Sequence, residues 1–188
     1  MNRRHVLTGL AAFGANVRAG DAIAQARVND DGLYTQPWFL ESFLHLAEDL
    51  DAAAAGGKRF AIMWELRGCP YCKNIHLVNF ADQDIVRFVQ DRFEILQLNI
   101  LGAREVTDFD GEKLSEKSLA QKYGVRSTPT FQFFPSASSP LISKPPHERE
   151  AVRAQGYLPP PQFHAMFRFV AERAYEHDSL SNYLMQHS

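Results

Sequence analysis

Two cysteines, Cys69 and Cys72, are the residues of this 188-residue chain whose type and spacing point most directly to chemistry. They are its only cysteines, and two residues separate them. Such a pair can cycle between a dithiol and a disulfide, because one thiolate attacks a disulfide and its neighbour then resolves the product. The same spacing also occurs in half of a zinc site and in structural disulfides.

The flanking segments predict that the pair lies where a strand passes into a helix. Residues 60–66 form an apolar run interrupted by a single glutamate, which is typical of a buried central strand. We expect a helix from Pro70 to about residue 79, since proline fits the first helical position. The unpaired N–H groups and the dipole of that helix would stabilise a thiolate at Cys69. Cys72, one turn along, would then resolve the mixed disulfide.

The alternative interpretations of the pair have less support in the sequence. A zinc site would need two further ligands, and although His76 offers one, the chain holds no second cysteine pair. A structural disulfide that closes so short a loop constrains the unfolded chain little. We therefore favour a redox-active pair and expect no metal and no cofactor.

A second motif lies further along the chain, at Ser127-Thr128-Pro129-Thr130. Proline is awkward at the entry to a sheet, because it cannot donate a hydrogen bond to the ladder. We predict a cis peptide bond before Pro129 that exposes the Thr128 backbone for pairing with an extended substrate. Together with Pro70 and Tyr71 from the first motif, Thr128 is expected to contact the substrate.

The rest of the chain alternates between helical and strand patterns and predicts one α/β domain over residues 37–176. Apolar residues spaced by three and four indicate helices, and continuous apolar runs indicate strands. The expected helices are residues 37–54, 70–79, a helix capped by Asp82, 115–123 and one that opens at Pro159-Pro160-Pro161, and the expected strands are 60–66, 93–100, 130–134 and an edge strand at 150–157. We interpret residues 136–147 as an exposed loop and residues 177–188 as a loose C-terminal tail.

The first 26 residues carry the features of an export signal. Arg3 and Arg4 precede a modestly apolar run, and residues 24–26 fit the Ala-x-Ala cleavage pattern. The paired arginines also resemble a twin-arginine signal. Because the run is too short to span a bilayer, we expect cleavage and no stable membrane insertion. The periplasmic product would start with a polar leader segment over residues 27–36.

Composition excludes several other classes of protein. Hydrophobic residues make up 45% of the chain and charged residues 22%, which is typical of a folded protein and unlike a disordered chain. The net charge of −2 gives no reason to expect nucleic acid or an anionic membrane surface as a partner.

These motifs together resemble the thioredoxin superfamily. The similarity lies in the Cys-Pro-Tyr-Cys motif, in the segment around Pro129, and in Gly156-Tyr157 at the end of the last strand. Residues 64–73 are similar to periplasmic thioredoxins associated with bacterial sulfur oxidation (SoxW type). The resemblance implies a thioredoxin-like fold, with a mixed central sheet flanked by helices. It also implies Cys69 as the attacking thiol, Cys72 as the resolving thiol and Pro129 as a cis proline beside them.

One departure from the family leaves the route of the proton open. Thioredoxin has a buried aspartate six residues before the first cysteine, where this chain has Met63. Glu65 shares the strand parity of Met63, so it is either a proton relay or a charge at a solvated strand end. We expect His76 to be a solvent-facing helical residue rather than the acceptor of the Cys72 proton.

These features predict a periplasmic thiol-disulfide oxidoreductase that works as a reductant. Its expected substrates are disulfides of proteins or of cysteine-bound sulfur carriers. Its expected electron donor is a membrane protein with its own cysteines, because the periplasm holds no reducing buffer. A disulfide oxidase or isomerase is the alternative within the class, and a non-catalytic metal-binding or redox-sensing module is the alternative outside it.

Overall fold

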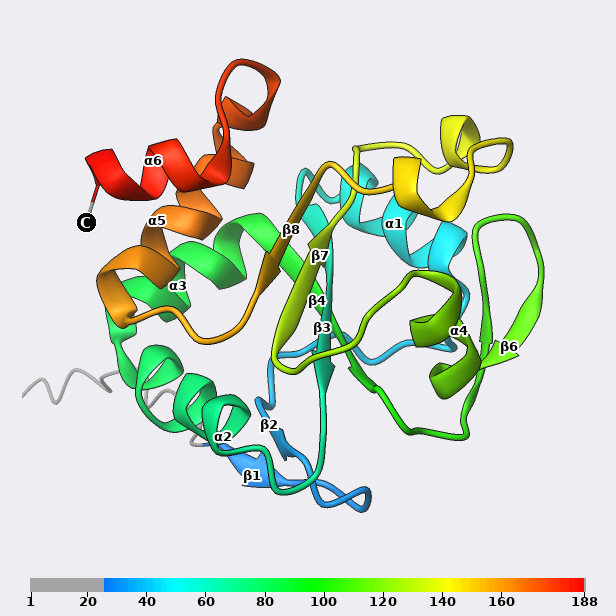
Figure 1. Cartoon of the computed structure of the whole chain (residues 1–188), viewed down its shortest axis with the longest axis horizontal. Coiled ribbons are helices and arrows are strands. Elements are labelled where there is room, and N and C mark those ends of the chain that lie inside the picture. The colour runs from blue at the N-terminus through cyan, green and yellow to red at the C-terminus, as the bar shows by residue number, and fades with distance from the viewer. Residues whose placement is uncertain (1–25, 188) are drawn as a thin grey trace, which may run out of the picture.

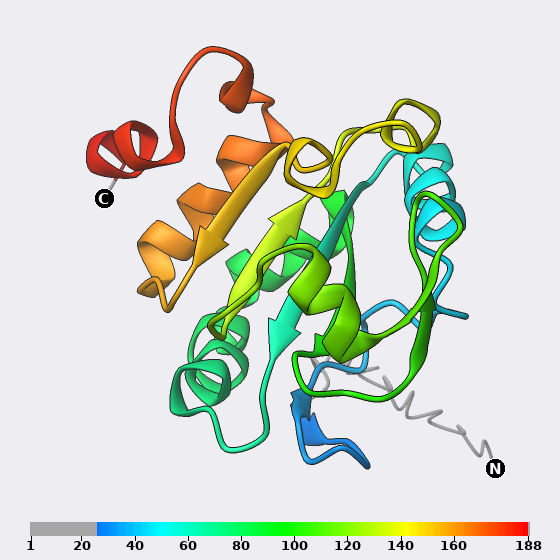
Figure 2. The ribbon, with the colours of Figure 1, turned by 45° about the vertical axis from the view of Figure 1, so that its right-hand side comes forward.

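A computed structural model describes residues 26–187, so the expected export signal lies outside the described residues except for its last position. A four-stranded sheet forms the middle layer, and helices cover both of its faces (Figures 1 and 2). Among the described residues, no helix combines the length and apolar composition of a membrane span. The strands are β1 (Arg27–Val28), β2 (Tyr34–Thr35), β3 (Arg59–Glu65), β4 (Phe93–Asn99), β5 (Glu105–Thr107), β6 (Lys113–Ser115), β7 (Thr130–Phe133) and β8 (Val152–Gln155). The helices are α1 (Leu46–Ala55), α2 (Pro70–Leu77), α3 (Gln83–Arg92), α4 (Glu116–Lys122), α5 (Pro160–Ala171) and α6 (Leu180–Gln186).

The main sheet has the strand order β4-β3-β7-β8. β4 runs parallel to β3, whereas β7 is antiparallel to β3 and β8 is antiparallel to β7. The sheet is therefore mixed, as predicted. Because β3 lies between β4 and β7, its last residues meet elements from both sides. Trp64 is paired with Thr130 of β7, and Glu65 is paired with Asn99 of β4.

Alternation along β3 divides the core into two layers. Ala61 and Met63 point to the face covered by α3 and α5, where a cluster of phenylalanines packs. Phe60, Ile62 and Trp64 point to the opposite face, against α1 and α4. All five side chains are at most 1% exposed, which fits a strand that is buried on both faces.

The predicted helix over residues 37–54 is wrong in its first half, because α1 begins at Leu46. The preceding segment runs beside the edge strand instead, and the Leu40 N–H donates to the Ile95 carbonyl at 2.9 Å. Leu44 has a φ of +63°, and a left-handed residue cannot continue a right-handed helix. Phe43, which the helical spacing places on the inner face, is 95% exposed.

The predicted loose tail over residues 177–188 is also wrong for its described part. Ser179 caps α6, and its hydroxyl accepts a hydrogen bond from the Asn182 N–H. Tyr183 is 7% exposed and packs on Phe169 of α5, with ring centroids 5.1 Å apart. Figure 1 shows α6 beside α5 at one end of the molecule. Buried aromatic area holds this segment in place.

The Ser/Pro-rich segment over residues 136–147 is more ordered than the exposed loop that its composition predicts. It contains two short 3₁₀ turns, at Ser139–Leu141 and Pro146–Glu148, and Leu141 is fully buried. Just beyond it, Arg149 forms an ion pair with buried Asp108 at 2.8 Å. Asp108 lies at the start of the turn between β5 and β6, so this ion pair connects that turn to the end of the segment between β7 and β8.

Candidate active site

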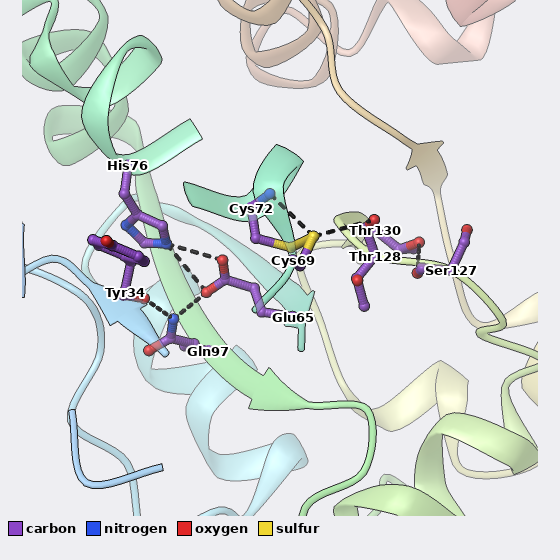
Figure 3. Close-up of a disulfide and its surroundings, with 9 residues drawn as sticks. All are labelled: Tyr34, Glu65, Cys69, Cys72, His76, Gln97, Ser127, Thr128 and Thr130. Carbon is purple, nitrogen blue, oxygen red and sulfur yellow. Dashed lines mark hydrogen bonds and ion pairs between the residues drawn. A yellow bond between two sulfur atoms is a disulfide. The ribbon is translucent and has the colours of Figure 1, made fainter. Parts of the chain in front are cut away.

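The cysteine pair lies at the carboxyl end of the central strand, where the chain turns from β3 into α2. Gly68 has a φ of +77°, a conformation that favours glycine, and it turns the backbone into the helix. Cys69 is the N-cap residue of α2, and Pro70 follows at the first helical position. Cys69 and Cys72 form a disulfide with their Cα atoms 5.3 Å apart (Figure 3). The structure confirms the predicted strand-to-helix setting.

The two sulfurs differ in accessibility and in polar contacts. Cys72 is 3% exposed, whereas Cys69 is half-buried. The Cys69 Sγ accepts a hydrogen bond from the Cys72 backbone N–H at 3.1 Å, one of the donors left free at the start of a helix. In the dithiol form the same N–H stabilises a thiolate. This arrangement suits Cys69 for attack on an external disulfide and Cys72 for the second, internal attack.

The peptide bond between Thr128 and Pro129 is cis, as predicted. The Thr128 carbonyl oxygen lies 3.6 Å from the Cys69 Sγ. Two hydrogen bonds fix this turn, because Thr130 Oγ1 donates to the Ser127 carbonyl and the Gly156 N–H donates to the Pro129 carbonyl. Figure 3 shows Thr128 on one side of the disulfide and Glu65 on the other. The structure thus brings two motifs that are distant in sequence to the same sulfur.

The residues expected to contact substrate surround Cys69. Pro70 and Tyr71 are exposed, with Tyr71 at 57%, while Thr128 is half-buried. Tyr71 stacks on Tyr157, whose ring centroid is 6.2 Å away at an interplanar angle of 25°. Tyr157 follows β8 and belongs to the same surface. The sequence indicated it only through the resemblance of Gly156-Tyr157 to the end of the last strand in the thioredoxin superfamily. An aromatic face therefore lies next to the more accessible cysteine.

Glu65, for which the sequence left two interpretations open, is a buried residue. It is 1% exposed, so the interpretation as a charge at a solvated strand end is wrong. Both of its carboxylate oxygens contact His76 Nε2, at 3.0 and 3.1 Å. The Gln97 amide donates a further hydrogen bond to Oε2. These donors satisfy the carboxylate in a place where an unpaired charge would be costly.

His76 is not the solvent-facing residue that its helical position predicts. It is 2% exposed and lies among the rings of Tyr34, Phe39 and Phe80. It lies four positions after Cys72, so both side chains lie on one face of α2, and that face packs against the end of β3. The prediction failed because the polar partner that makes burial possible, Glu65, belongs to another element.

Two glutamines complete this buried cluster, and neither was predicted as a site residue from the sequence. Gln97 donates to Glu65 and to the Tyr34 carbonyl, the latter at 2.6 Å. Gln36 Nε2 lies 3.2 Å from the His76 carbonyl oxygen and 3.3 Å from His76 Nδ1. Gln97 offered a signal, since it is an isolated polar residue inside an apolar strand. Gln36 offered none, because glutamine is ordinary in a polar leader.

A cavity of about 300 Å³ joins the cysteines to this cluster. Its lining includes both cysteines, Glu65 and, from the leader segment, Leu33 and Tyr34. A space of this size admits water, which can carry a proton between polar groups that do not touch. Within residues 26–187, no three His, Cys, Asp or Glu side chains are grouped so as to hold a metal ion. The arrangement can perform dithiol–disulfide exchange with proton transfer at Cys72.

Several solved structures align with the chain at low sequence identity. A thioredoxin-fold protein from Helicobacter pylori aligns with a TM-score of 0.51 and 20% identity, over 74% of this chain and 96% of its own. A thioredoxin from Thermus thermophilus aligns with a TM-score of 0.48 and 25% identity, over 65% and 81%. The C-terminal domain of Neisseria meningitidis DsbD in its oxidised form aligns with a TM-score of 0.45 and 14% identity, over 65% and 90%.

No curated protein matches the sequence significantly. A family model described as a thioredoxin-like domain matches residues 46–171, which is more than half of the chain. The matched range runs from α1 to the end of α5 and contains both cysteines and Pro129. The mixed sheet, the disulfide at the start of α2 and the cis proline beside it agree with that match. The chain therefore belongs to the thioredoxin-like domain family.

Proposed function

We propose that this protein is a periplasmic thiol-disulfide oxidoreductase that works as a reductant. One observation carries the proposal: the half-buried Cys69 Sγ sits at the N-terminus of α2, 3.6 Å from the Thr128 carbonyl, with Cys72 buried behind it. A substrate strand that pairs with the Thr128 backbone would bring its own disulfide to Cys69. The exposed Tyr71 ring extends the surface on which that strand would lie.

The reaction has two exchange steps. The Cys69 thiolate attacks one sulfur of the substrate disulfide, a mixed disulfide forms, and the other substrate sulfur leaves as a thiolate that takes up a proton. The Cys72 thiol then loses its proton, and its thiolate attacks the Cys69 Sγ. The bond to the substrate breaks, the second substrate sulfur leaves and is protonated, and the Cys69–Cys72 disulfide remains. The substrate gains two electrons from the protein dithiol. Cys72 releases one proton in the second step, Cys69 released the other when its thiolate formed, and the two substrate thiolates take up two protons.

Glu65 is our candidate for the group that accepts the Cys72 proton. Both residues line the same cavity, and the Glu65 carboxylate is held there by hydrogen bonds from His76 and Gln97. Water in the cavity would carry the proton over any remaining gap. Glu65 would then take the role of the buried aspartate that thioredoxin has at the position of Met63.

The cellular setting is part of the proposal and rests on the sequence. Arg3, Arg4 and the Ala-x-Ala pattern at residues 24–26 support export to the periplasm. A reductant there needs electrons from a membrane protein with its own cysteines. The similarity of residues 64–73 to thioredoxins of sulfur oxidation makes cysteine-bound sulfur carriers candidate substrates beside protein disulfides.

Dithiol-dependent reduction of insulin tests the activity. The wild-type protein should catalyse it, and Cys69→Ser should abolish turnover. Cys72→Ser should instead accumulate a mixed disulfide between Cys69 and an insulin chain, visible by non-reducing electrophoresis and mass spectrometry. Wild-type turnover by Cys69→Ser would disprove the mechanism.

N-terminal sequencing of the protein from a periplasmic extract tests the location. We expect a mature chain that begins at Arg27, the first residue of β1. An intact N-terminus on protein recovered from the cytoplasm would contradict export. Replacing Arg3 and Arg4 by lysine should block export only if the twin-arginine route is used.

A further inference from the structure

Residues 27–36, the leader segment, lie against the active site although they precede the family-matched range. β1 and β2 form an antiparallel hairpin, and Leu33 in its second arm is 2% exposed. The side chain of Arg67, two residues before Cys69, donates from Nε to the Asp31 carbonyl at 2.9 Å. Leu33 and Tyr34 line the cavity that also holds Glu65 and Cys72. The hairpin is therefore one wall of the active site.

Gln36, the residue after β2, reaches the buried imidazole of His76. It is 3% exposed, and its Nε2 faces both the His76 carbonyl oxygen and His76 Nδ1. A backbone carbonyl only accepts hydrogen bonds, so it requires the NH₂ end of the Gln36 amide to point toward it. The second proton of that NH₂ group then points at Nδ1, which must be the unprotonated, accepting nitrogen.

The contacts on the other side of the imidazole agree with this assignment. Nε2 lies 3.0 and 3.1 Å from the two oxygens of Glu65, so the ring proton sits on Nε2 and is donated to the carboxylate. The Tyr34 ring also stacks on the imidazole, with 6.4 Å between the ring centroids. The NH₂ group of Gln36 therefore favours an unprotonated Nδ1, because it can donate a hydrogen bond only to a nitrogen that carries no proton.

A neutral His76 has a consequence for Glu65. Within the described residues, no lysine or arginine forms an ion pair with Glu65, whose polar contacts come from His76 and Gln97. An imidazolium at His76 would instead place a positive charge against the carboxylate that is to receive a proton. With a neutral imidazole, Glu65 receives hydrogen bonds from His76 and Gln97 but no positive charge from either, and it lines the same cavity as Cys72.

We propose that Gln36 is a positioning residue that holds His76 in its neutral Nε2–H form and thereby keeps Glu65 able to accept the Cys72 proton. This inference rests on the function proposed above. In the resolving step the Cys72 S–H bond breaks, the proton passes to Glu65, and the Cys72 electron pair forms the bond to the Cys69 Sγ. The substrate sulfur leaves as a thiolate.

The tautomer of His76 is measurable directly. The mature protein is labelled with ¹⁵N-histidine, reduced and studied by NMR at neutral pH. His76 should show a protonated Nε2 and an unprotonated Nδ1. Gln36→Glu places a carboxylate against Nδ1 and should protonate it, and Gln36→Leu should do so to a smaller extent. An Nδ1–H signal from His76 in the wild-type protein overturns the proposal, whether or not the variants fold.

The resolving step is measured with Ellman's reagent, 5,5′-dithiobis(2-nitrobenzoate). Cys69 attacks it and releases one nitrothiobenzoate, and Cys72 then releases the second. We expect the second release to slow at least roughly tenfold in Gln36→Glu and less in Gln36→Leu, since general acid–base groups contribute about 10²- to 10⁴-fold. The first release should keep its wild-type rate, and exposed Gln83→Glu serves as the matched control.

The outcomes separate this inference from the function on which it rests. Folded Gln36→Glu with an unchanged second release overturns the role of Gln36, even if the wild-type protein reduces insulin. A wild-type protein that reacts normally with Ellman's reagent but does not reduce insulin overturns the proposed function, and leaves the role of Gln36 supported by the variants.

Discussion

The imidazole of His76 sits against both carboxylate oxygens of Glu65, and neither side chain reaches solvent. Glu65 is the last residue of β3, and His76 lies on the face of α2 that also carries Cys72. The strand-to-helix turn that presents Cys69 to a substrate therefore also brings these two groups together. A polar pair at this depth is costly unless every donor and acceptor is matched, so its presence beside the cysteines favours a role in their chemistry.

The first prediction concerns turnover. Glu65→Gln keeps the size of the side chain but removes the proton acceptor, and we expect insulin reduction to slow by about 10²-fold, the lower range for general acid–base catalysis. The loss should lie in the resolving step, so trapping of insulin by Glu65→Gln/Cys72→Ser should match that by Cys72→Ser alone. Equal turnover of Glu65→Gln and wild type would exclude Glu65 as the proton acceptor. Exposed Glu148→Gln is the control.

The second prediction concerns stability at the same pair. Among the described residues, His76→Leu leaves the buried Glu65 carboxylate with Gln97 as its donor. The lost hydrogen bond to a charged group should cost roughly 1.5–3 kcal/mol of unfolding free energy. His76→Leu/Glu65→Leu also removes the charge and should be more stable than His76→Leu alone. Urea unfolding of the oxidised proteins measures both, with exposed His147→Leu as the control. A double variant whose loss of stability equals the losses of His76→Leu and Glu65→Leu added together would mean that the two residues do not interact.

The cysteine motif and the cis proline were predictable because their surroundings are local. Gly68, Cys69 and Pro70 after an apolar strand predict the turn and the start of the helix. Pro129 itself identifies the peptide bond that is cis. The Glu65–His76 pair was not predictable in this way. Its burial depends on Gln36, which lies forty residues away from His76 in the chain. A polar residue on a helix is solvent-facing by default, and only the three-dimensional contact reverses that expectation.

The ends of the elements show a related limit of sequence patterns. Helical spacing extended α1 back over Phe43, but the backbone there bonds to the edge of the sheet, which competes with helix formation. Tyr183 belongs to a short polar helix whose own pattern carries no strong signal. The helix is ordered because the ring of Tyr183 packs on Phe169. In both places tertiary contacts decide the structure, since isolated helical turns are marginal in water.

The third prediction tests that contact. Tyr183→Ala removes a nearly buried ring from Phe169 and should cost about 3 kcal/mol, within the range for aromatic truncation. Tyr183→Phe keeps the ring and loses only the hydrogen bond from the hydroxyl to Glu172, so it should cost about 1 kcal/mol or less. Denaturant unfolding compares them. A Tyr183→Ala variant as stable as Tyr183→Phe would mean that the C-terminal helix adds nothing to the fold.

The fourth prediction concerns acid stability. Burial raises the pKa of Asp110, but hydrogen bonds from Lys122 at 2.7 Å and Arg149 at 2.8 Å outweigh it and hold the pKa well below its usual range. A lowered carboxylate pKa stabilises the fold above the pKa of the unfolded chain, about 3.9, and this contribution is lost as the pH falls below that value.

Asp110→Asn should therefore be less stable than wild type at pH 6, and the difference should shrink as the pH falls from about 4 toward 2. Lys122→Met removes one of the donors and should reduce the acid dependence of stability in the same direction. Urea midpoints across this pH range measure the effect. A constant gap between Asp110→Asn and wild type would show that the ion pairs do not lower the pKa.

The last prediction concerns the direction of electron flow. Thiolate stabilisation at the first cysteine makes such couples oxidising, and two cations flank the motif in sequence. Both are engaged elsewhere, because the Arg67 Nε donates to the Asp31 carbonyl and the Lys73 Nζ lies 5.8 Å from the centroid of the Tyr34 ring. Tyr71, between the cysteines, carries no charge. Within residues 26–187, the donor to the Cys69 Sγ is the backbone N–H of Cys72.

We therefore expect the Cys69–Cys72 couple to be more reducing than about −180 mV, the value for protein disulfide isomerase, and to lie nearer the glutaredoxin range of about −200 to −230 mV. Equilibration with glutathione buffers measures it. Tyr71→His places an imidazole beside the thiolate and should shift the potential toward oxidising values, while Tyr71→Phe should leave it unchanged. A wild-type potential near −120 mV, where strong periplasmic oxidants lie, would reverse the assignment and make the protein a disulfide oxidase.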